Sequence, residues 1–375
     1  DSSSEGTQDQ KDGRSAQAEA DQQRREELAR RIRESPDQAL KSEFSSSFLT
    51  LLEKGRLSVA VSTYQAGQVV FLRAENGKLN THFCSFNRPM GIAARGNRLV
   101  VGTNNEVFEF RNTPAVAPKV EPKNTHDACF IPRSIHYTGN VDIHELDFAG
   151  DELWFVNTRF SCLCTLDLDH SFVPRWRPPW VSAYAVEDRC HLNGLAVVEG
   201  RPRYVTALGM TDTRGGWREN KNAGGVLYDM IREKVLVDGL SMPHSPRWYR
   251  GKVWFLESGY GSLSWYDPKT LETRRLAQMP GFTRGLDFVD RYALVGLSQV
   301  RETNTFEGIP ITADGSERRS GVWIIDLETG ETVGMLRFSD AVEEIFAVKI
   351  LPGLTFPSLL EPGHPLIGTS YVLPD

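Results

Sequence analysis

The stretch MPHSPRWYRGKVWFLES, residues Met242–Ser258, decides the fold because its pattern recurs along the chain. A short polar approach leads into an apolar strand, a turn and a second strand that often carries Trp, Phe or Val in alternation. The other copies, spaced by about fifty residues, are RPMGIAARGNRLVVGT (88–103), DIHELDFAGDELWFVNT (142–158), CHLNGLAVVEGRPRYVTA (190–207), FTRGLDFVDRYALVGLS (282–298) and the truncated EEIFAVKILPG (343–353). Six copies of such a unit predict an all-β fold, a six-bladed β-propeller.

The two ends of the chain are expected to close one blade together. The last copy has an inner strand at Ile345–Leu351 but no blade of its own, whereas residues 47–86 supply at least three strand candidates before the first copy. Pairing the two ends removes the sheet edges that an open ring would expose. We therefore expect a propeller over residues 44–375, with one blade built from both chain ends.

Residues 1–43 are expected to form a polar tail that is disordered or partly helical. This segment is rich in Ser, Gln, Asp, Glu and Arg and has no aromatic residue, so it cannot bury enough apolar surface to order itself. Within it, Ala18–Glu34 consists largely of strong helix formers, and Ser35-Pro36 would end a helix there. The sequence begins at Asp1 and not at Met, which is consistent with a segment upstream.

The composition argues against several classes of partner. The 375 residues carry a formal charge of -6, with acidic and basic residues interspersed, so neither nucleic acid nor an anionic membrane is an expected partner. No apolar stretch reaches the roughly eighteen residues of a membrane-spanning helix. The five cysteines are few for this length and odd in number, which favours a reducing, cytoplasmic compartment.

Several segments are specific enough to suggest a family. They are TRFSCLCTLDLDHSFVPRWRPPW (158–180), DRCHLNGLAVVEGRPRYVTALGMTDTRGGWRENKNAGGVLYD (188–229), LSMPHSPRWY (240–249), PGFTRGLDF (280–288), LVGLSQVRET (294–303) and EEIFAVKILPG (343–353). From residue 44 onward the chain resembles an uncharacterised bacterial family of conserved hypothetical propeller-like proteins, a domain of unknown function. The resemblance implies a β-propeller and no particular reaction, so it assigns no functional residue.

Alignment of the six copies places one residue per blade just before the innermost strand. In a propeller these strands line the central channel, and the residues before them converge at one mouth. The aligned residues are Met90, His144, Asn193, His244, Arg284 and Glu344, and His191 lies two residues before Asn193. We call these seven residues the mouth ring and expect it to bind a small polar or anionic ligand.

The sharpest hypothesis for the mouth ring is a divalent metal. His144, His191 and His244 would supply imidazole nitrogens, and Glu344 or Glu343 a carboxylate oxygen, a ligand set that suits Zn, Mn or Fe. The ring nitrogens would then converge within about 4 Å of one point, because metal–nitrogen bonds are near 2 Å. A metal can polarise a carbonyl or acidify water, so the enzyme would be a metal-assisted lyase or hydrolase.

Catalysis would give the other polar residues of the ring separate roles. Glu344 would act as a ligand or base, Arg284 would clamp a carboxylate or phosphate, and Asn193 would orient the substrate. A metal-free enzyme is an alternative, in which His144 beside Glu145, or His244 with a nearby carboxylate, acts as the general base.

Two interpretations without catalysis compete with these. The histidines can satisfy buried polar groups between blades, as buried polar side chains usually do. The propeller can also be a non-catalytic protein-interaction module or scaffold, whose faces and charged tail dock a protein partner, because the fold does not fix the function.

The loop TDTRGGWRENKNAGG (211–225) is a second candidate for ligand contact. It places Arg214, Trp217 and Arg218 among glycines, which predicts a cationic and aromatic ligand rim over the channel. The competing interpretation is a solvated hairpin.

Overall fold

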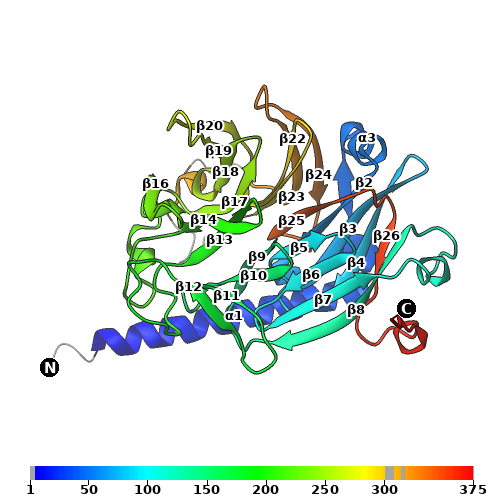
Figure 1. The fold of residues 1–375 in the computed structure, drawn as a ribbon, viewed down its shortest axis with the longest axis horizontal. Helices are drawn as coiled ribbons and strands as arrows, with labels where there is room; N and C mark the ends of the chain where they lie inside the picture. The colour runs from blue at the N-terminus through cyan, green and yellow to red at the C-terminus, as the bar shows by residue number, and fades with distance from the viewer. Residues whose placement is uncertain (1–4, 300–307, 314–316, 375) are drawn as a thin grey trace.

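Six sheets surround a central axis, which confirms the six-bladed propeller (Figure 1). The computed structural model describes residues 5–299, 308–313 and 317–374. We number the blades in chain order, starting with the blade that holds both chain ends. In blades 2 to 6 the chain runs outward from the innermost strand, so each copy of the repeated pattern supplies the two inner strands of one blade. The innermost strands of these blades are β5 (Ile92–Arg95), β9 (Ile143–Ala149), β13 (Leu192–Val198), β17 (Pro243–Tyr249) and β21 (Phe282–Val289).

The outer strands of blades 2 to 6 follow in chain order. The second strands are β6 (Arg98–Gly102), β10 (Glu152–Asn157), β14 (Arg201–Ala207), β18 (Lys252–Glu257) and β22 (Tyr292–Ser298). The third strands are β7 (Glu106–Asn112), β11 (Cys162–Thr165), β15 (Gly225–Asp229), β19 (Ser262–Tyr266) and β23 (Gly321–Asp326). The fourth strands are β8 (Ala128–Tyr137), β12 (Val173–Trp176), β16 (Lys234–Leu240), β20 (Thr273–Gln278) and β24 (Thr332–Phe338).

Blade 1 is shared by the two chain ends, as the sequence predicts. Its innermost strand is β25 (Ala347–Pro352), and its outer strands are β2 (Leu57–Ser62), β3 (Gln68–Glu75) and β4 (Lys78–Ser85). The junction of the two ends is an unbroken antiparallel register from Leu57 opposite Pro352 to Ser62 opposite Ala347. The innermost strands contact one another in the cyclic order β25, β5, β9, β13, β17, β21 and back to β25, so the ring is closed.

Two more terminal segments reinforce neighbouring blades. β1 (Ser42–Phe44) adds to β24 at the outer edge of blade 6, and β26 (Pro357–Leu359) adds in parallel to β8 at the edge of blade 2. Both cover strand edges that would otherwise remain unpaired over these residues.

The core lies between the blades, with one apolar cluster at each of the six interfaces. The side chains of a strand alternate between its two faces, and β3 shows the result. Val70 and Leu72 pack toward blade 6, whereas Val69 and Phe71 pack toward blade 2. Every blade therefore contributes to two clusters, so the stability of each depends on both neighbours.

The N-terminal segment contains three α-helices among the described residues. α1 (Glu5–Glu34) includes the helix expected at Ala18–Glu34 and ends just before Ser35-Pro36; α2 (Pro36–Ala39) follows. Among the α1 side chains that the structure describes, Leu28 is the fully buried one, and it packs with Ala39 and Ala341. Burial of one leucine contributes about 1.5–3 kcal/mol.

α3 (Ser46–Gly55) is an element that the sequence analysis did not predict. The Ser45 hydroxyl accepts a hydrogen bond from the Phe48 amide and caps its first turn. Phe48 and Leu52 bury the inner face of α3 against blades 1 and 6. Short 3₁₀ helices in the described connections are η1 (Tyr64–Ala66), η2 (Ala117–Lys119), η3 (Gly216–Asn220), η4 (Ser258–Tyr260), η5 (Pro310–Thr312) and η6 (Ile367–Thr369). In this part of the chain no helix is both long enough and apolar enough to cross a membrane.

Ion pairs join innermost strands of different blades. Arg247 of β17 donates to Glu145 of β9 at 2.8 Å, although blade 4 lies between their blades in the ring. Lys349 of β25 pairs with Asp287 of β21 at 3.3 Å. The side chains of Arg247 and Glu145 are only 13% and 5% exposed, so water compensates little if one partner is lost.

Replacing Arg247 with Met should therefore lower the free energy of unfolding by about 3–5 kcal/mol, because Glu145 is left buried without its counter-ion. Urea denaturation measures this change. The control is Arg175→Met. Arg175 pairs with Glu152, and their side chains are 39% and 48% exposed, so loss of this pair should lower the free energy of unfolding by no more than about 1 kcal/mol. Equal losses in the two variants would contradict a stabilising role for the buried pair.

Candidate functional site

The mouth ring is built on a backbone turn that repeats in four blades. Two residues before the ring position of blades 2 to 5, the chain adopts a left-handed φ at Arg88 (52°), Asp142 (53°), His191 (48°) and Met242 (50°). This conformation is unfavourable for residues other than glycine and persists where the surrounding structure enforces it. The repeated turn brings each approach segment into its innermost strand in the same way.

The turn also fixes the tautomer of two histidines. The Nδ1 atom of His144 lies 3.1 Å from the Asp142 carbonyl, and that of His244 lies 2.9 Å from the Met242 carbonyl. A carbonyl can only accept, so Nδ1 carries the proton in both rings and Nε2 presents a lone pair. Burial, with the nearby positive Arg284, lowers the pKa of His144 and of His244 well below the ordinary value, so both are neutral.

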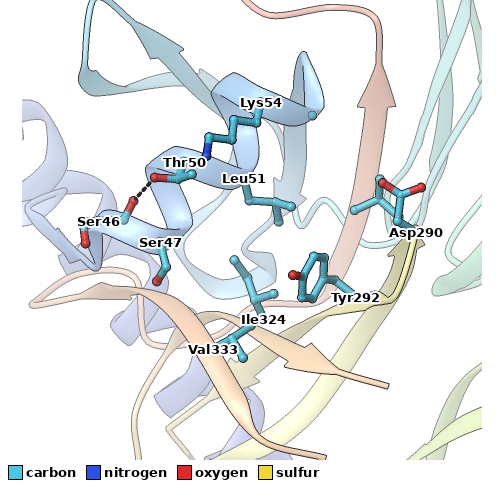
Figure 2. Close-up of a pocket in the computed structure, with 11 residues that line it drawn as sticks. Ser46, Ser47, Thr50, Leu51, Lys54, Asp290, Tyr292, Ile324 and Val333 are labelled. Atoms are coloured by element: carbon cyan, nitrogen blue, oxygen red, sulfur yellow. Dashed lines mark hydrogen bonds between the residues drawn. The ribbon is translucent and has the colours of Figure 1, made fainter. Parts of the chain in front are cut away.

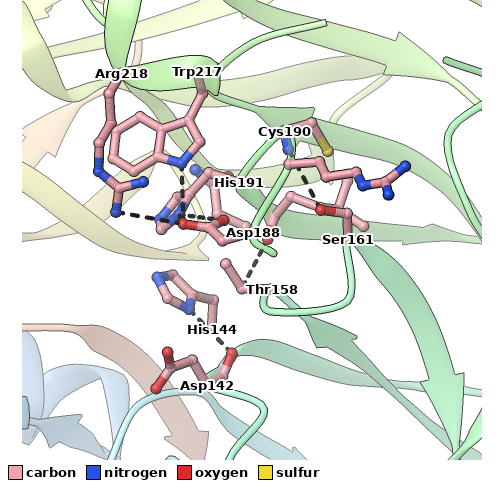
Figure 3. A network of polar contacts seen from close by, with 12 residues as sticks. Asp142, His144, Thr158, Ser161, Asp188, Cys190, His191, Trp217 and Arg218 are labelled. Carbon is pink, nitrogen blue, oxygen red and sulfur yellow. Dashed lines mark hydrogen bonds and ion pairs between the residues drawn. The ribbon is translucent and has the colours of Figure 1, made fainter. Parts of the chain in front are cut away.

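His191 is oriented by a carboxylate that the sequence analysis did not select (Figure 3). Its Nδ1 donates to Asp188 at 2.9 Å, and the Trp217 indole donates to the same carboxylate at 3.0 Å. The His191 ring lies between those of His144 and Trp217, with ring centres 4.8 and 4.5 Å away. Asp188 thus fixes the orientation of the His191 ring through Nδ1 and leaves Nε2 out of this contact.

Blade 3 fixes the segment that carries this pair. The Thr158 hydroxyl donates to the Leu192 carbonyl at 2.7 Å, and the Cys190 amide donates to the Ser161 hydroxyl at 3.4 Å. Both hydroxyls come from the loop that follows β10 (Figure 3). The approach to β13 is therefore tied to the neighbouring blade on both sides of His191.

Arg284 is a buried cation whose guanidinium donors are only partly matched by hydrogen-bond acceptors among the described residues. It is 8% exposed; its Nη1 lies 3.3 Å from Glu344, its Nη2 lies 3.2 Å from Nε2 of His244, and the guanidinium lies 4.2 Å from the centre of the Phe346 ring. Its Nε atom is buried and has no hydrogen-bond partner among the described residues. Burial lowers the pKa of Arg284, and the charge of Glu344 only partly opposes this shift.

The structure brings the rings of His144 and His191 together, whereas His244 contacts Arg284. The available nitrogen of His244 accepts from Arg284, and a guanidinium beside it opposes the binding of a second cation. Within residues 5–299, 308–313 and 317–374, no group of three or more His, Cys, Asp or Glu side chains is arranged to hold a metal. The metal hypothesis therefore stays a prediction.

The other predicted residues lie around this centre. Asn193 joins blades 4 and 5, since its side chain donates to the Pro243 carbonyl at 3.0 Å and accepts from Thr206 at 2.7 Å. Of the predicted rim, Trp217 is buried under the loop, whereas the side chain of Arg214 is 63% exposed and that of Arg218 51%. Arg218 covers the Trp217 ring at 4.2 Å and lies 3.7 Å from Asp188.

Sequence reasoning missed two further residues beside the predicted ring residues. Tyr64 comes from η1 in blade 1, and burial raises the pKa of its hydroxyl to about 12 against the opposing charge of Arg88. Asp142 occupies the left-handed position before His144, and burial raises the pKa of its carboxyl. The repeat alignment could have identified Asp142, because it stands two positions before the ring residue His144. Tyr64 lies in a connection that has no counterpart in the repeat.

A surface pocket of about 530 Å³ lies away from the mouth ring, between α3 and blade 6 (Figure 2). Leu51 of α3 and Tyr292 and Ile324 of blade 6 provide apolar lining, and Lys54 and Asp290 provide charged lining. None of the seven mouth-ring residues lines it. Its mixed lining identifies no particular ligand.

The neutral histidines make stability depend on pH in a defined direction. The folded-state pKa values of His144 and His244 lie below the unfolded value of 6.5, so the unfolded chain binds more protons once the pH falls below that value. Between about pH 7 and 5, the free energy of unfolding should fall by up to about 1.4 kcal/mol per pH unit for each of the two histidines.

Urea denaturation across this range, on wild type and His144→Gln, isolates the contribution of one histidine from that of the carboxyl groups. The variant should show the shallower pH dependence. The same slope in both proteins would contradict a buried neutral His144.

Comparison with known proteins gives a family and no activity. No curated protein matches the chain. Among solved structures, a chain of the crystal structure of a nidogen/laminin complex is 9% identical, with 79% of this chain and 99% of that chain covered and a TM-score of 0.47. The computationally designed Ika8 protein is 11% identical, with 80% and 90% covered and a TM-score of 0.41. The family model of a domain of unknown function, DUF4915, matches residues 46–360, and the chain therefore belongs to this family.

Proposed function

We propose that the mouth ring binds a small hydroxylated anion, such as a sugar acid or a sugar phosphate. The observation that carries this proposal is Arg284, a buried guanidinium with a single carboxylate contact at 3.3 Å and a buried Nε that lacks a partner among the described residues. A buried charge is costly unless it is paired and hydrogen-bonded. An anionic group on a ligand would supply the missing acceptor.

The two neighbouring histidines favour hydroxyl groups on the same ligand. His144 and His191 each have Nδ1 engaged, by the Asp142 carbonyl and by the Asp188 carboxylate. Their Nε2 atoms are then acceptors for O–H or N–H donors. A ligand that fits the site would therefore carry an anionic group facing Arg284 and hydroxyl donors facing the two histidines.

His191 is the residue best suited to move a proton. When its Nε2 takes a proton from a ligand hydroxyl or from carbon beside a carboxylate, the imidazolium that forms is stabilised by Asp188 at 2.9 Å. Trp217 and Thr158 hold this arrangement without occupying Nε2. In a catalytic version of the proposal, His191 is the general base and Asp188 its positioning residue.

A metal-assisted version of the same site would use Nε2 of His144 and of His191, and it would require a cation to bind near Arg284. The buried guanidinium disfavours this version, because like charges repel strongly where water is excluded. Elemental analysis of the purified protein tests it directly. Stoichiometric zinc, manganese or iron, lost in His144→Ala, would replace the metal-free proposal.

The binding test uses matched anionic and neutral polyols. Gluconate and glucose 6-phosphate should raise the melting temperature of the wild-type protein, whereas glucitol should not, since a ligand that binds only the folded state stabilises it. Arg284→Lys keeps the charge but loses the Nε donor and should weaken binding about tenfold or more.

Arg175→Met, on the outer part of blade 3, is the matched control and should bind like wild type. The proposal fails if neither anion stabilises the wild-type protein more than glucitol does. It also fails if Arg284→Lys and Arg284→Met respond to the anions as wild type does.

A further inference from the structure

One face of α1 touches the propeller beside the mouth ring. Arg24, Leu28 and Arg31 are spaced at i, i+4 and i+7, so they lie on the same side of the helix. Arg24 forms an ion pair with Glu343, and Arg31 forms one with Asp340. Leu28 is buried between these two pairs and packs with Ala341. The segment that receives α1 is thus residues 340–343.

This docking segment leads directly into the ring. Glu343 is the neighbour of Glu344, which contacts Arg284, and β25 begins at Ala347. α1 also contacts η1, the 3₁₀ helix that carries Tyr64, and the charge of Arg25 acts on the pKa of the Tyr64 hydroxyl. Two ring-bordering elements, one before β25 and one between β2 and β3, therefore lie against the same helix.

The helix α1 extends well beyond its docking face. Thirty residues span about 45 Å at 1.5 Å per residue, and the docking face occupies only the C-terminal part of the helix. In Figure 1 α1 runs along the lower side of the molecule, and its N-terminal end projects beyond the blades at the left. The rest of α1 is therefore long enough to cover ring residues outside the docking segment.

Within the described residues, the ion pairs that join α1 to the propeller are partly accessible to water. The Arg24 and Glu343 side chains are 27% and 10% exposed, and those of Arg31 and Asp340 are 35% and 40% exposed. Partly exposed ion pairs contribute little and weaken with salt. The one fully buried apolar side chain among the described α1 residues is Leu28. A segment held in this way can open while the propeller remains folded.

We propose that α1 is a displaceable cap that closes the mouth ring, an inference that rests on the ring being the binding site proposed above. In the closed state Arg24 and Arg31 hold the helix on residues 340–343. Opening breaks these two pairs and withdraws Leu28, which exposes His144 and His191. Ligand entry is then coupled to release of α1, because a ligand that needs the open state shifts the population toward it.

Histidine labelling with diethyl pyrocarbonate tests the cap without any ligand. The reagent acylates unprotonated imidazole nitrogens, and mass spectrometry gives the rate at each residue. In the double variant Arg24→Glu, Arg31→Glu, labelling of His144 and His191 should accelerate about tenfold, because two ion pairs become repulsions. His170, whose side chain is 68% exposed on the outer part of blade 3, should label at an unchanged rate.

The matched control is Arg30→Glu, Arg33→Glu, which changes the charge of the same helix by the same amount on its exposed face. It should label like wild type. Equal rates at His144 and His191 in both double variants would overturn the proposal. Accelerated labelling together with no binding of gluconate or glucose 6-phosphate would contradict the proposed ligand and leave the cap standing.

Hydrogen exchange of the wild-type protein provides a measurement that needs no variant. The amides of residues 19–34 in α1 should exchange at least about a hundredfold faster than those of β25, because opening of the cap does not require global unfolding. Equal protection of the two segments would show that α1 opens only when the propeller unfolds, and would overturn the cap.

Discussion

The pairing of β2 with β25 is the constraint on which the rest of the structure depends. Six residues from each end of the chain form this one unbroken antiparallel register, and without it blade 1 has no innermost strand. The apolar clusters on both sides of blade 1 would then lose Ala347, Val348 and Ile350. Since every blade packs on two neighbours, one missing strand affects the entire ring.

Closure also assembles the candidate site. Glu344 and Phe346 lie in the segment that leads into the closing strand, whereas Arg284 and His244 come from the two preceding blades. Two of the contacts of Arg284, with Glu344 at 3.3 Å and with the Phe346 ring at 4.2 Å, are made by the segment that leads into β25. The same end of the chain carries residues 340–343, on which α1 rests. The segment that leads into the closing strand therefore contributes both to the candidate site and to the docking of α1.

The repeat predicted the architecture well because the number and order of the blades follow from the spacing of the copies along the chain. Six copies with alternating apolar residues suffice to predict six blades and the shared blade, whereas α3 has no counterpart in the pattern and was missed. The alignment also selected His144, His244, Arg284 and Glu344, which lie together. It could not separate Asn193, which joins two blades, from a ligand residue, and it could not find Asp188 or Tyr64, which come from connections. Contacts between connections depend on tertiary packing and leave no periodic signal.

The claim that the buried guanidinium of Arg284 marks an anion site is tested most directly by crystallography with selenate, a tetrahedral oxyanion located by its anomalous scattering. The account predicts a selenium peak within hydrogen-bonding distance of the Arg284 guanidinium, on the side of His144 and His191. A map with well-occupied selenate on surface arginines and none at Arg284 would contradict it.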